Sequence, residues 1–139
     1  MCLFTKAKHP LIAQEDIVCY KIVHLDWHRG GGHFITPFQH TPIPDDVMSG
    51  ECPFKATGKK SALRVENGYG SFSGNGLVID SGYIHAWVDE NVSLTLSDRA
   101  AVYKCIIPAG TKYYKGWFNG WAAYDSICAE EIKFIERIR

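Results

Sequence analysis

Three side chains that could bind a flat ligand share one face of a strand-like segment. In residues 83–88, Tyr83, His85 and Trp87 recur at every second position, and this spacing places side chains on the same face of a β-strand. An imidazole between two aromatic rings could line a pocket for a nucleobase or a nicotinamide. The alternative is that the same face packs into the hydrophobic core.

A second group of aromatic and basic residues lies in the segment 112–124. Its candidate ligand-binding residues are Lys112, Tyr114, Trp117 and Trp121. Arg29, in the glycine run 28–33, joins them because a guanidinium beside bare backbone amides could hold a phosphate. Phe-Ile-Thr-Pro-Phe follows this run instead of a helix, so a simple turn is the alternative. Rings and donors without an activated nucleophile favour binding over turnover, and we predict no catalytic residue.

Histidines and cysteines do not combine into an obvious metal or thiol site. Four histidines lie close together in the sequence: His24, His28, His33 and His40. Spacing of four brings imidazoles together only on a helix, and glycines interrupt this region. The five cysteines are widely spaced and contain no Cys-x-x-Cys pair, which is typical of reduced, mostly buried thiols. We therefore predict no metal and no cofactor.

The composition indicates one globular unit, which we take as a single domain over residues 1–139. The apolar share is 46% and the charged share 22%, which is ordinary for a protein with a packed core. Fifteen basic residues balance fifteen acidic ones, so no long-range field would gather extended nucleic acid or an anionic membrane. No run approaches the roughly 20 apolar residues that span a bilayer, and the first residues lack the apolar run of a signal peptide. The expectation is a cytoplasmic protein, with homo-oligomerisation left open.

Two segments, 16–25 and 100–107, have the pattern of interior strands. Apolar residues occupy both alternating faces of the first, and the second has the same character. Residues 77–79 and 83–88 are two further short strands with a turn between them.

The rest of the chain is harder to assign. Residues 1–15 are predicted to be a lead-in segment that can still pack through Leu3, Phe4, Leu11 and Ile12. Residues 39–67 are predicted to be largely irregular, because prolines, glycines and charges are dense there, with a short strand over residues 62–66 as the one candidate element. The final residues, 126–139, have isoleucines at spacings that fit a helix, and an edge strand over 131–138 fits nearly as well. The predicted fold class is α+β and strand-rich: a small mixed or antiparallel sheet or barrel with one or two short helices.

Four stretches of the sequence carry a resemblance to a known group. They are MCLFTKAKHPLIAQEDIVCYKIV, ITPF, VYKCIIPAGTKYYKG and AAYDSI. Together they resemble a family of short proteins from gut bacteria, their phages and mobile elements, a family without an assigned activity. The resemblance covers most of the chain and implies a small, phage-associated accessory protein.

A fainter likeness links the chain to ADP-ribosyltransferase-type domains. It rests on a strand with Tyr-Lys, the central Gly-Tyr-Ile-His-Ala-Trp and the late Ile-Pro-Ala-Gly-Thr. Such NAD-dependent enzymes need an Arg or His on the first strand, a central Ser or Tyr and a late Glu. The likeness would give these roles to His24, to Tyr83 or Ser81, and to Glu130 or Glu131.

Three functional hypotheses follow. The first is a non-enzymatic module that binds a small, flat, nucleotide-derived molecule, as a phage protein would do to sequester a bacterial immune signal. The second is an ADP-ribosyl-transferring enzyme that uses NAD. The third is a structural or protein-interaction protein.

Overall fold

The fold is built almost entirely from antiparallel strands. The structure, a computed structural model, describes residues 3–26, 33–36, 41–57, 64–67, 75–79, 82–91, 99–118 and 124–139. Its elements in chain order are β1 (Leu3–Thr5), β2 (Leu11–Ile12), β3 (Ile17–Asp26), β4 (His33–Ile35), α1 (Asp45–Met48), β5 (Phe54–Lys55), β6 (Arg64–Asn67), β7 (Asn75–Ile79), β8 (Ile84–Trp87), β9 (Ala100–Ile107), β10 (Lys112–Phe118), β11 (Asp125–Ala129) and β12 (Glu131–Arg137).

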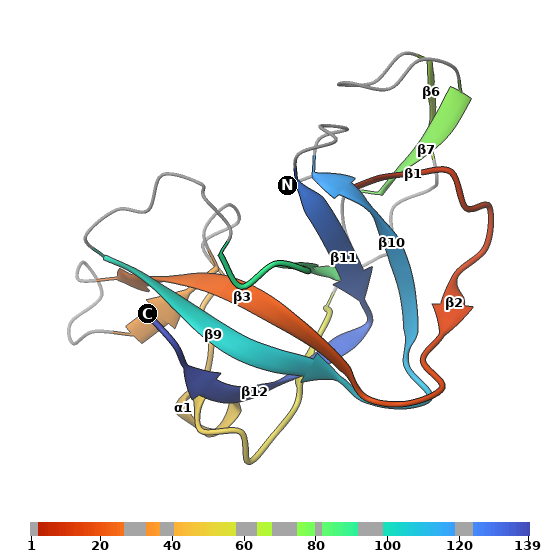
Figure 1. Cartoon of the computed structure of the whole chain (residues 1–139). Helices are drawn as coiled ribbons and strands as arrows, with labels where there is room; N and C mark the ends of the chain where they lie inside the picture. Colours follow the sequence, from red (N-terminus) through yellow and green to blue (C-terminus); the bar gives the residue numbers. More distant parts are fainter. Residues whose placement is uncertain are drawn as a thin grey trace.

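The strands follow one open path, β5-β12-β9-β3-β8-β11-β10-β1-β7-β6, with β2 attached to β10 and β4 to β3. Figure 1 shows one group of strands around β3, β9 and β12 and another around β10, β11 and β1. We call them the first half-sheet (β5, β12, β9, β3 and β4) and the second half-sheet (β8, β11, β10, β1, β7, β6 and β2). They meet where β3 pairs with β8 through Tyr20 opposite Trp87. A covalent connection also joins them, because β11 leads into β12 through Glu130.

The predicted strand-rich character is confirmed, but the sheet is larger than expected and its path is open. The described strands form an antiparallel sheet and not a small barrel or a mixed sheet. The described residues contain one helix, the four-residue α1. The end of the chain explains part of the difference, because the buried Ile132 and Phe134 alternate with the exposed Lys133 and Ile135 in β12. This period of two belongs to a strand, so the helix alternative for residues 126–139 is wrong.

The two strands predicted to be interior are interior. β3 lies between β9 and β8, and β9 lies between β12 and β3. The predicted lead-in segment contributes β1 and β2 to the sheet. Leu3 and Phe4 of β1 are completely buried, and β1 pairs with both β10 and β7. The region predicted to be largely irregular also contains α1 and β5, and β6 overlaps the short strand that was the candidate over residues 62–66.

Hydrophobic side chains pack on both faces of β3. The largest core, which we call the main core, includes Cys19 and Val23 of β3 and is covered by Val47 of α1 and Phe54 of β5. The opposite face of β3 contributes Ile22 to a cluster with Trp87 and Val102.

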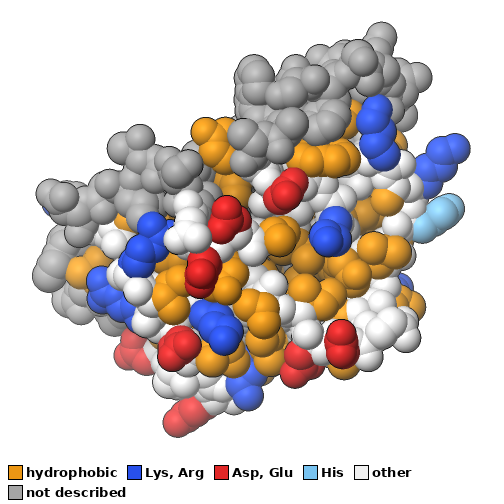
Figure 2. Space-filling model, in the orientation of Figure 1, with side chains coloured by type: hydrophobic (Ala, Val, Ile, Leu, Met, Phe, Trp, Pro, Cys, Tyr) orange, Lys and Arg blue, Asp and Glu red, His pale blue; other side chains and the backbone are white. Residues whose placement is uncertain are grey.

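The surface seen in Figure 2 carries basic and acidic side chains interspersed among hydrophobic ones. Within the described part of this face, positive charge is not gathered into the single basic stripe that tracks a nucleic-acid backbone. In the described residues, no helix has both the length and the apolar character needed to cross a bilayer.

Candidate functional site

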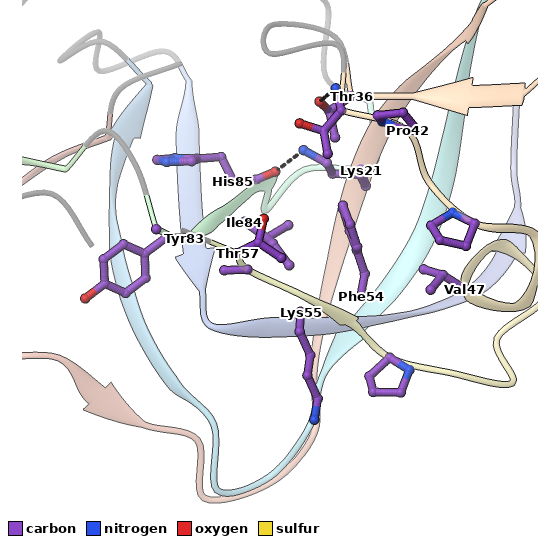
Figure 3. Close-up of a pocket in the computed structure, with 15 residues that line it drawn as sticks. Lys21, Thr36, Pro42, Val47, Phe54, Lys55, Thr57, Tyr83, Ile84 and His85 are labelled. Atoms are coloured by element: carbon purple, nitrogen blue, oxygen red, sulfur yellow. Dashed lines mark hydrogen bonds between the residues drawn. The ribbon is translucent and has the colours of Figure 1, made fainter. Parts of the chain in front are cut away.

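A cavity of about 350 Å³ opens beside the junction of the two half-sheets. It is lined by Lys21 of β3, by residues 82–85 at the start of β8, and by residues from Thr36 through α1 and β5 to Thr57. Figure 3 shows these segments around the Lys21 side chain. The site thus brings together three stretches of chain that are far apart in the sequence.

Lys21 is the most deeply buried charged residue of the cavity wall. Its side chain is 6% exposed. Nζ donates a 2.7 Å hydrogen bond to the backbone carbonyl of His85, as the dashed line in Figure 3 marks. This bond spans the junction between β3 and β8, next to the Tyr20–Trp87 pair.

The register of the strands explains why Lys21 points into this region. Cross-strand partners lie on the same face of a sheet, so Tyr20 shares a face with Trp87. The next residue, Lys21, therefore points to the other face, where Cys19 and Val23 join the main core. The amine lies at the edge of that core and lines the cavity.

The amine retains hydrogen-bonding capacity toward the cavity. A protonated lysine has three N–H donors, and the His85 carbonyl accepts one of them. Among the described residues, no carboxylate forms an ion pair with Lys21. Two donors can therefore be offered to a molecule in the cavity.

Burial also sets the protonation of this amine. It lowers the pKa of Lys21 from 10.5 to about 8. Burial raises the pKa of Cys19 to about 12 and also raises that of Cys105. Both thiols therefore stay protonated at neutral pH and give Lys21 no counter-charge. At pH 7 Lys21 is a cation, and it loses its proton more readily than a lysine in water.

Apolar side chains and hydroxyl groups form much of the remaining wall. Val47 is buried, and Phe54 is held by a ring contact with Phe134 at 6.1 Å between centroids. The backbone N–H of Thr36 donates to the Thr41 carbonyl at 2.9 Å, and the Thr41 N–H donates to the Thr36 Oγ1 at 2.9 Å. These contacts fix two sides of the cavity before any ligand enters.

The charge of the wall is positive. Its described residues include two lysines and no aspartate or glutamate. Lys55 is exposed, and Figure 3 shows its side chain extending away from Lys21. Lys21 therefore supplies the positive charge inside the cavity.

Two of the residues proposed from the sequence, Tyr83 and His85, line the cavity. His85 meets Lys21 through its backbone carbonyl, and Figure 3 shows its imidazole pointing away from the amine. The Tyr83 ring packs edge-on against Tyr114, with centroids 5.8 Å apart. The structure thus brings Tyr83 and Tyr114 together, with only Tyr83 in the cavity wall.

Trp87 lies in the core. It is 3% exposed, and its ring packs edge-on against Phe118 at 4.9 Å and Tyr124 at 6.4 Å between centroids. For this residue the structure agrees with the core-packing alternative, because stacking on a ligand would require an accessible ring face.

The remaining proposed residues do not line the cavity or fall outside the described part of the chain. Lys112 is exposed and pairs with Ile12 of β2. Trp117 is partly buried and contacts Phe4 at 6.3 Å between ring centroids. Trp121 and Arg29 lie outside the described residues.

The residues considered for ADP-ribose transfer do not share the cavity. Tyr83 lines it, whereas His24, Glu130 and Glu131 do not, and Ser81 is outside the described residues. Of the described side chains, no three from His, Cys, Asp and Glu are grouped so that they could hold a metal ion.

Sequence reasoning missed Lys21, the central residue of this site. Its signal was present, since Lys21 interrupts a run with Cys19 and Val23 on the face of a strand that was predicted to be interior. A lysine at such a position is rarely buried without a partner or a function. The pattern did not reveal which segment faces it, because His85 is 64 positions away in the chain.

The geometry is that of a small, partly apolar cavity with one buried amine. Val47 and Phe54 shape it and Lys21 gives it charge, whereas the Tyr83 ring points away from Lys21 and Phe54 (Figure 3). No family model, no curated protein and no solved structure matches the chain.

Proposed function

We propose that the protein binds one small anionic molecule in this cavity, with the Lys21 ammonium as the anchor for the negative group. The observation that carries the proposal is a buried cation that lines the cavity and has no carboxylate partner among the described residues. A phosphate or carboxylate would accept the two remaining N–H donors and supply the missing counter-charge.

The free-energy cost of burying the charged Lys21 amine in the folded protein supports this proposal. Burial disfavours the protonated amine, so a core without this charge would be more stable at neutral pH. Binding sites are where proteins retain such unfavourable groups. A ligand anion restores a favourable environment for the charge.

The cavity also limits the size of the ligand. Its volume of about 350 Å³ lies near the lower end of the roughly 300–1,000 Å³ that is typical of ligand sites. This favours a single small molecule over a polymer. A nucleotide-derived molecule of about one nucleotide unit is our preferred ligand, with its phosphate at Lys21 and its base toward Phe54. We propose its sequestration in a phage or mobile-element setting as the biological use.

The test compares adenosine monophosphate with adenosine, which lacks the phosphate. Thermal unfolding and calorimetric titration at pH 7 should show binding of adenosine monophosphate and much weaker binding of adenosine. A ligand present at about 100 times its Kd stabilises the folded state by about 2.7 kcal/mol. Inorganic phosphate alone serves as the minimal anion.

Two variants make this test specific to the site. Lys21→Met should abolish the stabilisation by adenosine monophosphate, because it removes the anchor but keeps the aliphatic chain. Lys55→Met is the matched control and should retain it, since that side chain extends away from Lys21. Equal binding to the wild type and Lys21→Met, or no binding of either anion to the wild type, would contradict the proposal.

A further inference from the structure

We infer that the neutral form of the Lys21 amine reacts reversibly with a small aldehyde or ketone in the cavity to form an imine. The inference uses the same cavity as the proposed function, but it does not depend on binding of an anion. The ligand class is a neutral or weakly charged carbonyl compound with an apolar body, which the Val47 and Phe54 side chains would contact.

The hydrogen bond of Lys21 orients the amine for this reaction. The His85 carbonyl oxygen is an acceptor only, so the amine must direct an N–H toward it. When Lys21 is neutral, its nitrogen lone pair must therefore point away from that oxygen. Because Lys21 also lines the cavity, a ligand carbonyl carbon can approach the lone pair there.

The reaction needs no reagent beyond the two partners. The nitrogen lone pair forms a bond to the carbonyl carbon, and the C=O π electrons move to oxygen. A proton passes from nitrogen to that oxygen, which gives a carbinolamine. A solvent water protonates the hydroxyl, the nitrogen lone pair forms the C=N bond as the C–O bond breaks and water leaves, and the resulting iminium returns one proton to solvent. Amine and carbonyl are thus converted to imine and water without oxidation or reduction.

The surroundings of the amine favour its neutral form. Burial lowers its pKa to about 8. The groups facing it among the described residues are the protonated Cys19 of β3, the protonated Cys105 and the phenol of Tyr103 on β9, and the His85 carbonyl of β8. Both thiols stay protonated, and therefore uncharged, at neutral pH because burial raises their pKa values. At pH 7.5 about a quarter of the Lys21 amine is neutral. The neutral fraction of a lysine with the ordinary pKa of 10.5 is about one part in 1,000 at this pH.

Benzaldehyde with sodium cyanoborohydride tests the inference on the wild-type protein. The hydride reduces the imine to a stable secondary amine, and peptide mapping by mass spectrometry locates the modified lysine. At pH 7.5 we expect Lys21 to be modified at least about tenfold faster than the exposed Lys112 and Lys133, because its neutral fraction is larger. Modification of Lys21 no faster than that of Lys112 would overturn the inference.

A variant separates this reaction from anion binding. Lys21→Arg keeps a cation but has no amine that forms an imine, so the mass adduct at position 21 should disappear. The control variant Lys112→Arg should keep the adduct at Lys21. Benzaldehyde carries no anion and adenosine monophosphate carries no aldehyde. Labelling without binding of adenosine monophosphate would therefore defeat the proposed function alone. Binding without labelling would defeat the imine alone.

Discussion

Lys21 is a single residue that lowers the stability of the folded protein. Its neighbours Cys19 and Val23 on the same strand face are completely buried, and a methionine in place of Lys21 would fit an apolar environment of this kind. The lysine instead needs a carbonyl partner across the junction. The unfavourable charge is the reason to look for function at this position.

The pH dependence of stability should reveal the buried amine. Below pH 8 both the folded and the unfolded protein carry a protonated Lys21, and the folded state bears the penalty of burying the charge. Between pH 8 and 10.5 only the unfolded state remains protonated, so this penalty is relieved as pH rises. The difference of 2.5 between the two pKa values corresponds to roughly 3 kcal/mol. Lys21→Met should therefore be more stable than the wild type at pH 7, and its advantage should shrink by up to that amount toward pH 10.5.

Urea unfolding of both proteins in reducing buffer measures this difference. The comparison is clearest between pH 7 and 9, because above pH 9 the buried thiols, whose pKa values are raised by burial, destabilise the folded protein, and the charge of Lys21 lowers the pKa values of Cys19 and Cys105 only in the wild type. A stability advantage of Lys21→Met that does not change with pH would show that Lys21 is not a buried cation.

At the scale of elements, the first strand of the chain fits against β10 because one position there lacks a side chain. Phe4 of β1 pairs with Trp117 of β10. A Cβ added at the neighbouring Gly116 would collide with the Phe4 backbone carbonyl. The glycine thus allows β1, which holds two completely buried side chains, to pack closely on the second half-sheet.

Gly116→Ala should accordingly destabilise the protein. The backbone of β1 cannot yield like the end of a flexible side chain, so we expect a loss of about 1–3 kcal/mol in the free energy of unfolding. Thermal or urea unfolding followed by circular dichroism measures it. Lys115→Ala, at an exposed position of the same strand, is the control and should change stability by less than about 0.5 kcal/mol. Equal effects of the two substitutions would contradict the close approach.

The whole molecule depends on a narrow junction between its half-sheets. Trp87 stands at this junction opposite Tyr20. Its ring also packs with Ile22 and Val102 of the first half-sheet and with Phe118 of the second. The same junction borders the cavity, since the Lys21 hydrogen bond crosses it. The residues that stabilise the junction therefore lie beside the residues that line the cavity.

Trp87→Ala should be among the most destabilising single substitutions in this protein. Removal of a buried tryptophan side chain costs about 3–5 kcal/mol, and urea unfolding by circular dichroism measures the loss. Trp117→Ala, at a partly buried position, should cost less. A Trp87→Ala protein of unchanged stability that fails to bind adenosine monophosphate would instead restore the ligand-binding role proposed from the sequence.

The sequence by itself determined the local features of this protein. The alternation of apolar residues predicted the interior strands β3 and β9, and the period of two predicted that Tyr83, His85 and Trp87 share a face. The cross-strand register places His85 on the same face as Cys128 and Tyr114, because these three residues lie opposite one another in one row across three strands. These properties depend on residues close together in the chain, so a local pattern contains them.

Only the tertiary structure decided which face borders the cavity. A strand pattern gives two faces but not the partner strands, and a shift in register by one residue exchanges them. Because Tyr20 pairs with Trp87, the Trp87 side chain packs in the core and the Lys21 side chain points toward the cavity. The site depends on contacts between residues tens of positions apart, and the spacing of residues along the chain carries no information about such contacts.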